Sequence, residues 1–533
     1  MILVGILLIS ASLRLIELST IPSGFSWDEA AIGYNGYGIL TSRRDEWLER
    51  LPISFRSFGD YKAPVAIYLN TISSAIFGLS VWSTRFPMAM AGIVTTLMSY
   101  LLGTVIFKSK RIGLVSALMT AVSPWNIHFS RIAFDSGIAV AFSAVGFWLF
   151  FKGLRQDSWK KLLYWLVSGS FFVVSIYAYH STKMFIPLAL VVLAIWFRSH
   201  LISNWKITTI SIIASIVMLL PLANEMMFGN AAERFFMTST FTQASESEHP
   251  IQLIGSQFLS HFSPSFLLFG GGDDNYRHAN GVFGVLSYLE VIGIILGLLF
   301  LMHSTFVMLK TTDRSKNGIF TDHNRRIVLI WTLVLLALVP SAVSEGAPSS
   351  NRAHGVVPFI QIIASVGIVT FIQSMTNHLK TKHSKIVEWI LYAILLVFVL
   401  IQTGLYVTSY RTIYRTVAGD DFQEGLLQAM QVSRQYESQV DRVVLTSAPG
   451  QVYIYALFVK QLTPFQWQHG ALSNYTFKEI DWAVDQNLSN TLLIGSPEEI
   501  PIEEADFLIE SWEGKSLFVG VITEKIDADE DSQ

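Results

Sequence analysis

The strongest candidates for a chemical role in this chain are two adjacent carboxylates. Asp28 and Glu29 stand in the segment Phe-Ser-Trp-Asp-Glu-Ala-Ala-Ile-Gly-Tyr at residues 25–34, just after a first apolar segment over residues 1–18. A carboxylate beside a membrane can accept a proton from an acceptor group or hold a divalent cation. The structural alternative is a helix start, where the positive end of the helix dipole favours acidic residues.

Basic and polar side chains recur near the ends of several other apolar segments. The cations Lys62, Arg131, Lys183 and Arg352 could neutralise a phosphate leaving group, because charge-assisted hydrogen bonds to phosphate are strong. Asp135 is a second candidate acid. We expect weaker substrate contacts from the remaining candidates, which are Tyr61, His128, His180, Arg277, His278 and His354. Together these residues favour transfer from a phosphate carrier at a membrane surface.

The usual nucleotide-binding motifs do not account for this chemistry. The glycine-rich segment at residues 270–274 lacks the Lys-Ser/Thr of a P-loop, and no Gly-x-Gly-x-x-Gly follows a predicted strand. We therefore expect a lipid-linked donor rather than a nucleotide, and no nucleic-acid partner.

Composition places the candidates in a membrane protein. The chain of 533 residues is 51% hydrophobic and 14% charged, against about 25% charged for soluble proteins. It has no cysteine, which excludes disulfides, thiolate metal sites and a cysteine nucleophile. The first segment, Met1–Leu18, has neither a basic start nor a small-residue cleavage site, so we expect a retained span rather than a signal peptide.

The pattern of apolar segments predicts about eleven transmembrane helices. Five loops assigned to the inner face are basic, as the positive-inside rule requires if the N-terminus is cytoplasmic. The long outer loop over residues 223–281 is acidic in comparison. The predicted spans are 1–18, 81–107, 112–127, 136–151, 162–180, 184–197, 207–222, 282–303, 327–343, 355–374 and 387–410.

One apolar segment is left out of that count. Pro64–Leu79 is apolar enough to be a span, but counting it would move every later basic cluster to the outer face. We predict that it lies in the outer interface or dips into it, within a first outer loop over residues 19–80. An additional span with a compensating error elsewhere is the alternative.

The last part of the chain differs in character. Residues 411–533 carry 20 acidic and 8 basic side chains, whereas residues 1–410 carry a net positive charge. Helical patterns alternate there with short β-rich runs, which predicts a small α/β domain. The helical patterns are Phe422–Tyr436 and Val452–Leu462, and the β-rich runs are Arg442–Thr446, Thr491–Ile494 and Ser516–Thr523. Because an odd number of spans follows a cytoplasmic N-terminus, we expect this domain outside the cell, on the same side as the first loop. Its acidic end, Asp527–Asp531, is expected to be disordered.

The order of the motifs resembles the GT-C glycosyltransferases. The chain has Trp-Asp-Glu-Ala-x-x-Gly-Tyr, then Asp-Tyr-Lys-Ala-Pro at 60–64, Ser-Thr-Arg-Phe-Pro at 83–87, and Ser-Pro through Ser-Arg to Asp135. Within that class it is similar to the protein O-mannosyltransferases and the lipid A aminoarabinose transferases, here called the glycosyltransferase family 39-like branch. The resemblance covers about residues 1–410 and is specific over 25–135. It implies 11–13 spans, a first outer loop with juxtamembrane helices, and a polyprenyl-phosphate sugar donor.

The resemblance also implies roles for particular residues. Asp28 matches the first-loop acid at the catalytic centre, with Glu29 as its partner, and Asp135 matches the second acid. Lys62 falls where the family has a Lys-Pro-Pro lysine that contacts the carrier phosphate, although this chain reads Lys-Ala-Pro. Arg352 and His354 match carrier contacts less specifically, and the acidic tail matches nothing identified.

The sequence thus predicts a multi-pass plasma-membrane glycosyltransferase of the GT-C type. It would move a hexose or pentose from a polyprenyl-phosphate carrier to a lipid, glycan or protein acceptor on the outer face. Mg²⁺ or Mn²⁺ at Asp28 and Glu29 is an open possibility. The rival function, a transporter or flippase of lipid-linked sugars, should place charges near mid-bilayer and show paired repeats.

Overall fold

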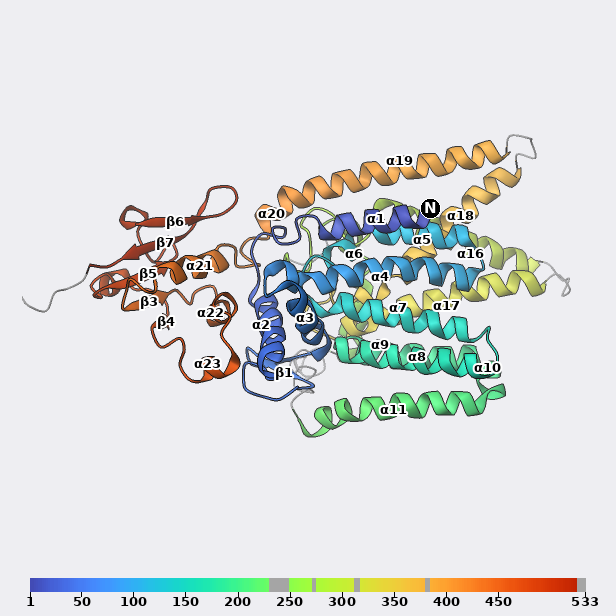
Figure 1. Cartoon of the computed structure of the whole chain (residues 1–533). Coiled ribbons are helices and arrows are strands. Elements are labelled where there is room, and N and C mark those ends of the chain that lie inside the picture. The colour runs from blue at the N-terminus through green and yellow to red at the C-terminus, as the bar shows by residue number, and fades with distance from the viewer. Residues whose placement is uncertain (230–248, 271–274, 311–316, 379–383, 525–533) are drawn as a thin grey trace, which may run out of the picture. The chain divides into compact units, whose positions relative to one another are not determined.

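Long apolar helices dominate the computed structural model, which describes residues 1–229, 249–270, 275–310, 317–378 and 384–524 (Figure 1). The predicted acidic end Asp527–Asp531, most of the 270–274 glycine segment and part of the 223–281 loop lie outside these residues. The described chain divides into two units. The helical unit contains Met1–Ile16, Ala63–Val65 and Met88–Arg411, and the loop–tail unit contains Glu17–Lys62, Ala66–Pro87 and the residues from Thr412 onward.

Every predicted span contains helix in this structure. Seven helical segments of the described chain are long and apolar enough to cross a membrane, and α1, α3, α9 and Tyr288–His303 are shorter apolar helices. The helices that reach into the helical unit are α1 (Ile2–Leu15), α4 (Val81–Phe107), α5 (Lys110–Val122), α6 (Pro124–His128), α7 (Asp135–Gly153), α8 (Ser158–Ala178), α9 (Thr182–Trp196), α10 (Arg198–Ser203), α11 (Trp205–Phe228), α14 (Pro250–Ser260), α15 (Pro264–Leu268), α16 (Tyr288–Lys310), α17 (Asn317–Ala342), η1 (His354–Val356), α18 (Phe359–His378) and α19 (Ser384–Arg411).

Some of the predicted spans are not continuous helices over their whole length. The 112–127 segment is broken between α5 and α6, where Ser123 is extended and Pro124 starts a new helix. Proline lacks the N–H that a continuing helix would need, but it suits a first helical position. The 282–303 segment becomes helical only at Tyr288.

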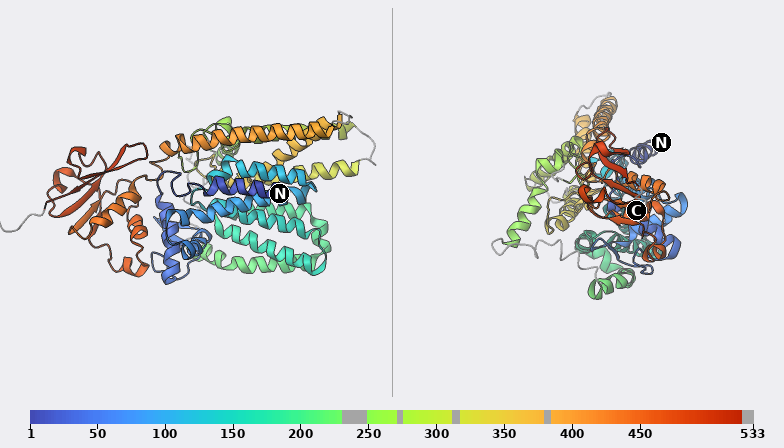
Figure 2. Two further views of the ribbon diagram at one scale, coloured as in Figure 1. Left: turned by 45° about the horizontal axis from the view of Figure 1, so that its top comes forward. Right: turned by 90° about the vertical axis from the view of Figure 1, so that its left-hand side faces the viewer.

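Small residues allow the helices of this unit to pack closely. Helices α7 and α8 run side by side, and α16 packs on α18 (Figure 2). A Cβ atom placed on Gly367 of α18 would lie 2.0 Å from the carbonyl oxygen of Gly293 in α16. The α16–α18 contact is therefore a close backbone approach of the kind that small residues permit in membrane helices.

The loop–tail unit combines the first loop with the residues after 411. Its first part holds α2 (Trp27–Ser42), the hairpin β1 (Phe55–Ser57) and β2 (Asp60–Lys62), and most of α3 (Pro64–Phe77). Its second part holds α20 (Ile413–Val417), α21 (Leu426–Tyr436), β3 (Arg442–Leu445), α22 (Tyr453–Lys460), α23 (Pro464–Gln468), β4 (Tyr475–Phe477), α24 (Trp482–Asp485), β5 (Thr491–Gly495), η2 (Ile502–Glu504), β6 (Phe507–Glu510) and β7 (Ser516–Ile522).

The tail strands form one mixed sheet in the order β4-β3-β5-β7-β6. Strand β3 pairs in parallel with β4 and β5, whereas β7 is antiparallel to β5 and β6. Strands β3, β5 and β7 lie in the runs predicted from sequence, and the short β4 and β6 were not predicted.

Helix α2 of the first loop shares the hydrophobic core of this tail. Phe25, Ala30 and Tyr34 are buried in one cluster with tail residues that include Leu457 of α22. The ring centroids of Phe25 and Phe458 are 5.0 Å apart. The first loop therefore packs with the tail domain, a long-range pairing that local sequence patterns do not reveal.

Candidate functional site

The segment that carries the two carboxylates begins a helix. Ser26 is the N-cap of α2, and its hydroxyl accepts a hydrogen bond from the Glu29 N–H while the Glu29 carboxylate accepts one from the Ser26 N–H. This reciprocal capping box satisfies two of the N–H groups that a helix start leaves without partners. The acidic pair therefore lies at a helix start, as the structural alternative proposed, and Glu29 is the residue that caps this helix.

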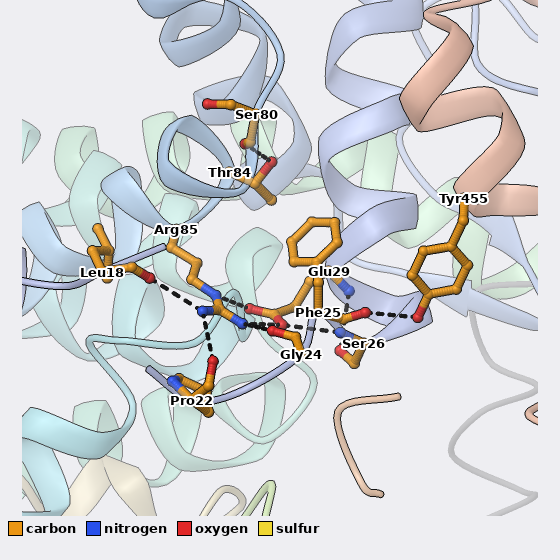
Figure 3. Close-up of polar contacts among 10 residues, drawn as sticks. All are labelled: Leu18, Pro22, Gly24, Phe25, Ser26, Glu29, Ser80, Thr84, Arg85 and Tyr455. Carbon is orange, nitrogen blue, oxygen red and sulfur yellow. Dashed lines mark hydrogen bonds and ion pairs between the residues drawn. The ribbon is translucent and has the colours of Figure 1, made fainter. Parts of the chain in front are cut away.

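Glu29 is also half of a fully buried ion pair, which Figure 3 shows. Arg85 of α4 donates from Nε to Glu29 Oε1 at 2.8 Å and from Nη2 to Oε2 at 2.9 Å, and both side chains are inaccessible to solvent. The other guanidinium hydrogens reach the carbonyl oxygens of Leu18, Pro22 and Gly24. Glu29 thus fixes the start of α2 against Arg85 in the first turns of α4, which belong to the same unit.

Asp28 has a different environment one residue earlier. Its carboxylate forms an ion pair with the ammonium group of Lys62, which stands at the end of β2. The Asp28 side chain is 25% exposed and that of Lys62 is 12% exposed. The Lys62 ammonium also lies 5.8 Å from the ring centroid of Phe58. Sequence reasoning put Asp28 and Lys62 at one site, and the structure places them in contact.

The β1–β2 hairpin positions Lys62. Phe55 is opposite Lys62 and Arg56 is opposite Tyr61 in the antiparallel register. Pro64 then begins α3, so Lys62 sits at a strand end next to a helix start. Tyr61, a predicted substrate contact, lies partly buried on the neighbouring hairpin position.

The acidic pair does not fit the divalent-cation site considered from sequence. Both Glu29 oxygens accept hydrogen bonds from Arg85, and the Asp28 carboxylate faces a lysine ammonium. Within the described residues there is no cluster of three or more His, Asp or Glu side chains able to hold a metal ion. We therefore derive no step through a metal.

The remaining candidates belong to the helical unit. Asp135 is the first residue of α7, where an acidic side chain suits the helix dipole. The hydroxyl of its neighbour Ser136 lies 3.2 Å from Nδ1 of the buried His354. Ser136 and His354 also line a small cavity, together with Tyr179 and Arg352. Asp135 therefore stands beside the region that holds two predicted carrier contacts.

Arg131 is held by backbone carbonyls. Its Nη1 donates to the carbonyl oxygens of Leu13 and Ile16, each at 2.9 Å, at the C-terminal end of α1. Its guanidinium carbon also lies 5.7 Å from the ring centroid of Tyr410. These contacts favour a structural role in capping α1 over the predicted phosphate contact.

Two histidines in this unit are buried and neutral at physiological pH. Burial lowers the pKa of His128 to about 4 and that of His354 to about 3. His128 Nε2 lies 3.0 Å from the Arg277 carbonyl oxygen, and the His278 ring lies 5.7 Å from that of Phe134. Neutral imidazoles can position a sugar hydroxyl, but they add no positive charge for a phosphate.

Lys183 and Arg352 keep cationic groups at helix ends. Lys183 is near the start of α9 and its ammonium lies 3.2 Å from Nδ1 of His180. Arg352 follows α17 and donates to the Glu345 carbonyl oxygen. Lys62, Lys183 and Arg352 are therefore the candidate cations not committed to capping a long helix.

Sequence reasoning missed two buried arginines. Arg85 lies in the motif at residues 83–87, but the sequence predicted no role for it or for Arg14. Arg14 donates to the carbonyl oxygens of Ser10, Thr120 and Ala121 and to the Ser130 hydroxyl. A signal was available, because an arginine inside an apolar segment is costly unless it finds such partners.

The architecture matches that of known glycosyltransferases. The structure of ArnT from Cupriavidus metallidurans superposes with a TM-score of 0.56 at 12% identity, covering 97% of each chain, and so does the same protein bound to undecaprenyl phosphate. The archaeal oligosaccharyltransferase AglB from Archaeoglobus fulgidus, in complex with an inhibitory peptide and a dolichol-phosphate, matches with a TM-score of 0.50 at 13% identity, covering 93% of this chain and 69% of that one. The chain therefore has the GT-C fold, as the sequence predicted.

Sequence comparison finds a similarity to mannosyltransferases over part of the chain. Residues 61–223 match the family model described as Dolichyl-phosphate-mannose-protein mannosyltransferase. A stretch of 115 residues is 33% identical to the Bacillus subtilis (strain 168) protein named "Putative mannosyltransferase YkcB". That stretch is 22% of this chain and only 15% of the relative's length. The resemblance to mannosyltransferases stated from the motifs is confirmed. The family-model match over residues 61–223 includes Lys62, Arg131 and Asp135.

Proposed function

We propose that the chain is an integral membrane glycosyltransferase that moves a sugar from a polyprenyl-phosphate donor to an acceptor. The observation that carries the proposal is the contact between Asp28 and Lys62 in a partly exposed position, beside the buried Glu29–Arg85 pair. The family match over residues 61–223 and the fold shared with ArnT support it. Undecaprenyl phosphate is the natural first ligand to test, because ArnT binds it.

The chemistry follows from the different environments of the two acids. Asp28 is accessible enough to contact an acceptor hydroxyl or amine and can accept its proton as general base. Lys62 can stabilise the negative charge that develops on the phosphate leaving group. Acceptor oxygen or nitrogen then attacks the anomeric carbon as the sugar–phosphate bond breaks. Direct attack would invert the configuration at that carbon.

The resting ion pair has a consequence for this mechanism. Lys62 neutralises Asp28 before ligands bind, and a phosphate that attracts the ammonium would release the carboxylate to act as base. Donor binding would thereby prepare the base. Glu29 keeps its own cation, Arg85, throughout, so it would position α2 without reacting.

The transporter alternative is not favoured by the described charges. The candidate residues stand at helix starts, strand ends or loops, as Asp28, Lys62, Asp135 and Lys183 do. A sugar-lipid transporter would be expected to place such groups near mid-bilayer.

Substitution of Lys62 tests the role assigned to its charge. Lys62→Ala removes one charge-assisted contact, so we expect undecaprenyl phosphate to bind about tenfold or more weakly to the purified protein. Lys478→Ala is the matched control, because Lys478 also pairs with an aspartate, Asp485, but is 43% exposed on the tail domain. Equal binding by wild type and both variants would remove Lys62 from the site.

A further inference from the structure

The helical unit contains a cavity of about 450 Å³ that the transfer mechanism does not use. Its lining residues come from the C-terminal ends of α4, α7 and α9 and the residues that follow them, from the short helix α10, and from Arg325, Arg326 and Leu329 of α17. Its lining includes five basic side chains, and none of its described lining residues is acidic. The basic residues are Lys108, Arg155, His200, Arg325 and Arg326.

Capping of a helix accounts for only part of this positive charge. Arg155 donates to the carbonyl oxygen of Val105, and Arg326 donates to that of Ile106 at 2.7 Å, at the end of α4. Cations are favoured there by the helix dipole. Arg325 instead stacks 5.9 Å from the ring centroid of Trp196. Lys108 adds a further cation to the lining, and His200 adds an imidazole.

The basic groups are close enough to affect each other. Partial burial, together with the positive charge of Arg326, lowers the pKa of Arg155 from its usual range. An anion placed between such groups would relieve that repulsion. The described lining of the cavity is thus basic and contains no carboxylate.

The position of the cavity along the helices suggests the kind of anion. Helix α7 starts at the candidate site with Asp135 and ends at Gly153 beside the cavity, a distance of about 28 Å for its 19 residues. That length is close to the thickness of a bilayer's hydrocarbon core, about 30 Å. With α7 crossing the membrane, the cavity would lie at the headgroup level of the leaflet opposite the one that holds Asp135. Trp196 and Phe197 supply the aromatic wall that suits this level.

We propose that this cavity binds the phosphate group of an anionic ligand, with the headgroup of an anionic phospholipid as its source. Arginine side chains are well suited to phosphate oxygens, and basic pockets between membrane helices are known to hold such headgroups. A soluble phosphate ester shares the same chemistry, so the test must separate the two sources. The proposal does not depend on the transferase activity.

The test is lipid titration of the purified full-length protein, followed by native mass spectrometry. Dioleoylphosphatidylglycerol should bind more tightly than dioleoylphosphatidylcholine. Arg325→Gln should weaken phosphatidylglycerol binding by about fivefold, as expected for one cation at a membrane surface. Arg325 is exposed and caps no helix here, so folding should survive and the melting temperature should not change. Arg198→Gln is the matched control, because Arg198 is exposed at the start of α10 but does not line the cavity.

These outcomes distinguish a specific phosphate site from general surface charge, and a lipid headgroup from a soluble phosphate ester. Equal binding of the two lipids to the wild type, or equal losses in Arg325→Gln and Arg198→Gln, would overturn the proposal. Selective loss in Arg325→Gln supports it. Glycerol 1-phosphate that displaces the bound lipid at low concentration would support the phosphate site and assign it to a soluble ester.

Discussion

At the scale of single residues, adjacent acids have opposite roles because their surroundings differ. Glu29 is enclosed with Arg85, whereas Asp28 faces Lys62 at a partly exposed position. The sequence could indicate that both acids mattered. It could not separate them, because the separation depends on Arg85, 56 positions further along the chain.

Glu29→Gln should destabilise the protein strongly. Removing one partner of a buried ion pair leaves the Arg85 charge without compensation, at a cost of about 3–5 kcal/mol. Thermal unfolding of the detergent-purified variant should therefore begin at a clearly lower temperature than that of the wild type. The control is Asp28→Asn, whose ion pair is partly exposed and should contribute about 1 kcal/mol or less. Similar melting temperatures for Glu29→Gln and wild type would refute the structural role of Glu29.

At the scale of helices and strands, the apolar pattern predicted where the transmembrane helices lie better than where they begin and end. The 81–107 span coincides with α4, and a helix occupies each other predicted span. The break at Pro124 was missed because the residues on both sides remain apolar. The packing of α2 on the tail was missed because it depends on contacts between distant residues such as Phe25 and Phe458.

The α16–α18 contact should not tolerate a side chain at Gly367. Gly367→Ala would force a methyl group against the Gly293 backbone, so we expect a loss of about 1–3 kcal/mol and a lower melting temperature. Gly404→Ala is the matched control in α19, because no atom lies within 4 Å of its added Cβ. A Gly367→Ala protein as stable as Gly404→Ala would show that these helices do not pack this closely.

The contact between the first loop and the tail should depend on pH through Glu46, which follows α2. Burial, with the Asp45 charge nearby, raises the pKa of Glu46 to about 7. The Tyr453 hydroxyl donates to its carboxylate, and the Asn35 amide lies 3.4 Å away. The folded state therefore holds a proton that the unfolded state releases near pH 4.5. Stability contributed by this group is present below that pH and is lost as the pH rises towards 7.

Melting curves recorded between pH 5 and pH 8 would check this dependence. The wild type should become less stable across pH 5–7, and Glu46→Gln should lose most of that slope because an amide does not titrate. Asp45, whose pKa burial raises to about 6, would leave a smaller residual slope. An unchanged slope in Glu46→Gln would assign the pH dependence to other groups.

At the scale of the whole molecule, the account predicts an orientation in the membrane. The fold and the apolar helices indicate a multi-pass membrane protein. From the basic loops we expect Lys108–Arg111 in the cytoplasm and the tail outside. Topology reporters fused at Lys108–Arg111 and at residue 420 should therefore report opposite faces. If they report the same face, the span count is wrong by an odd number, and α3 is the first helix to reconsider.

The central claim is that Asp28 takes part in sugar transfer and does not only begin a helix. The direct measurement is the rate at which purified Asp28→Asn and wild type, reconstituted into membranes that supply the acceptor, consume undecaprenyl-phosphate-linked mannose or aminoarabinose. We expect a rate roughly 10²–10⁴-fold lower for Asp28→Asn, the loss typical of a catalytic base, with a melting temperature close to that of the wild type. Transfer by Asp28→Asn at the wild-type rate would contradict the account and move the catalytic assignment to Asp135.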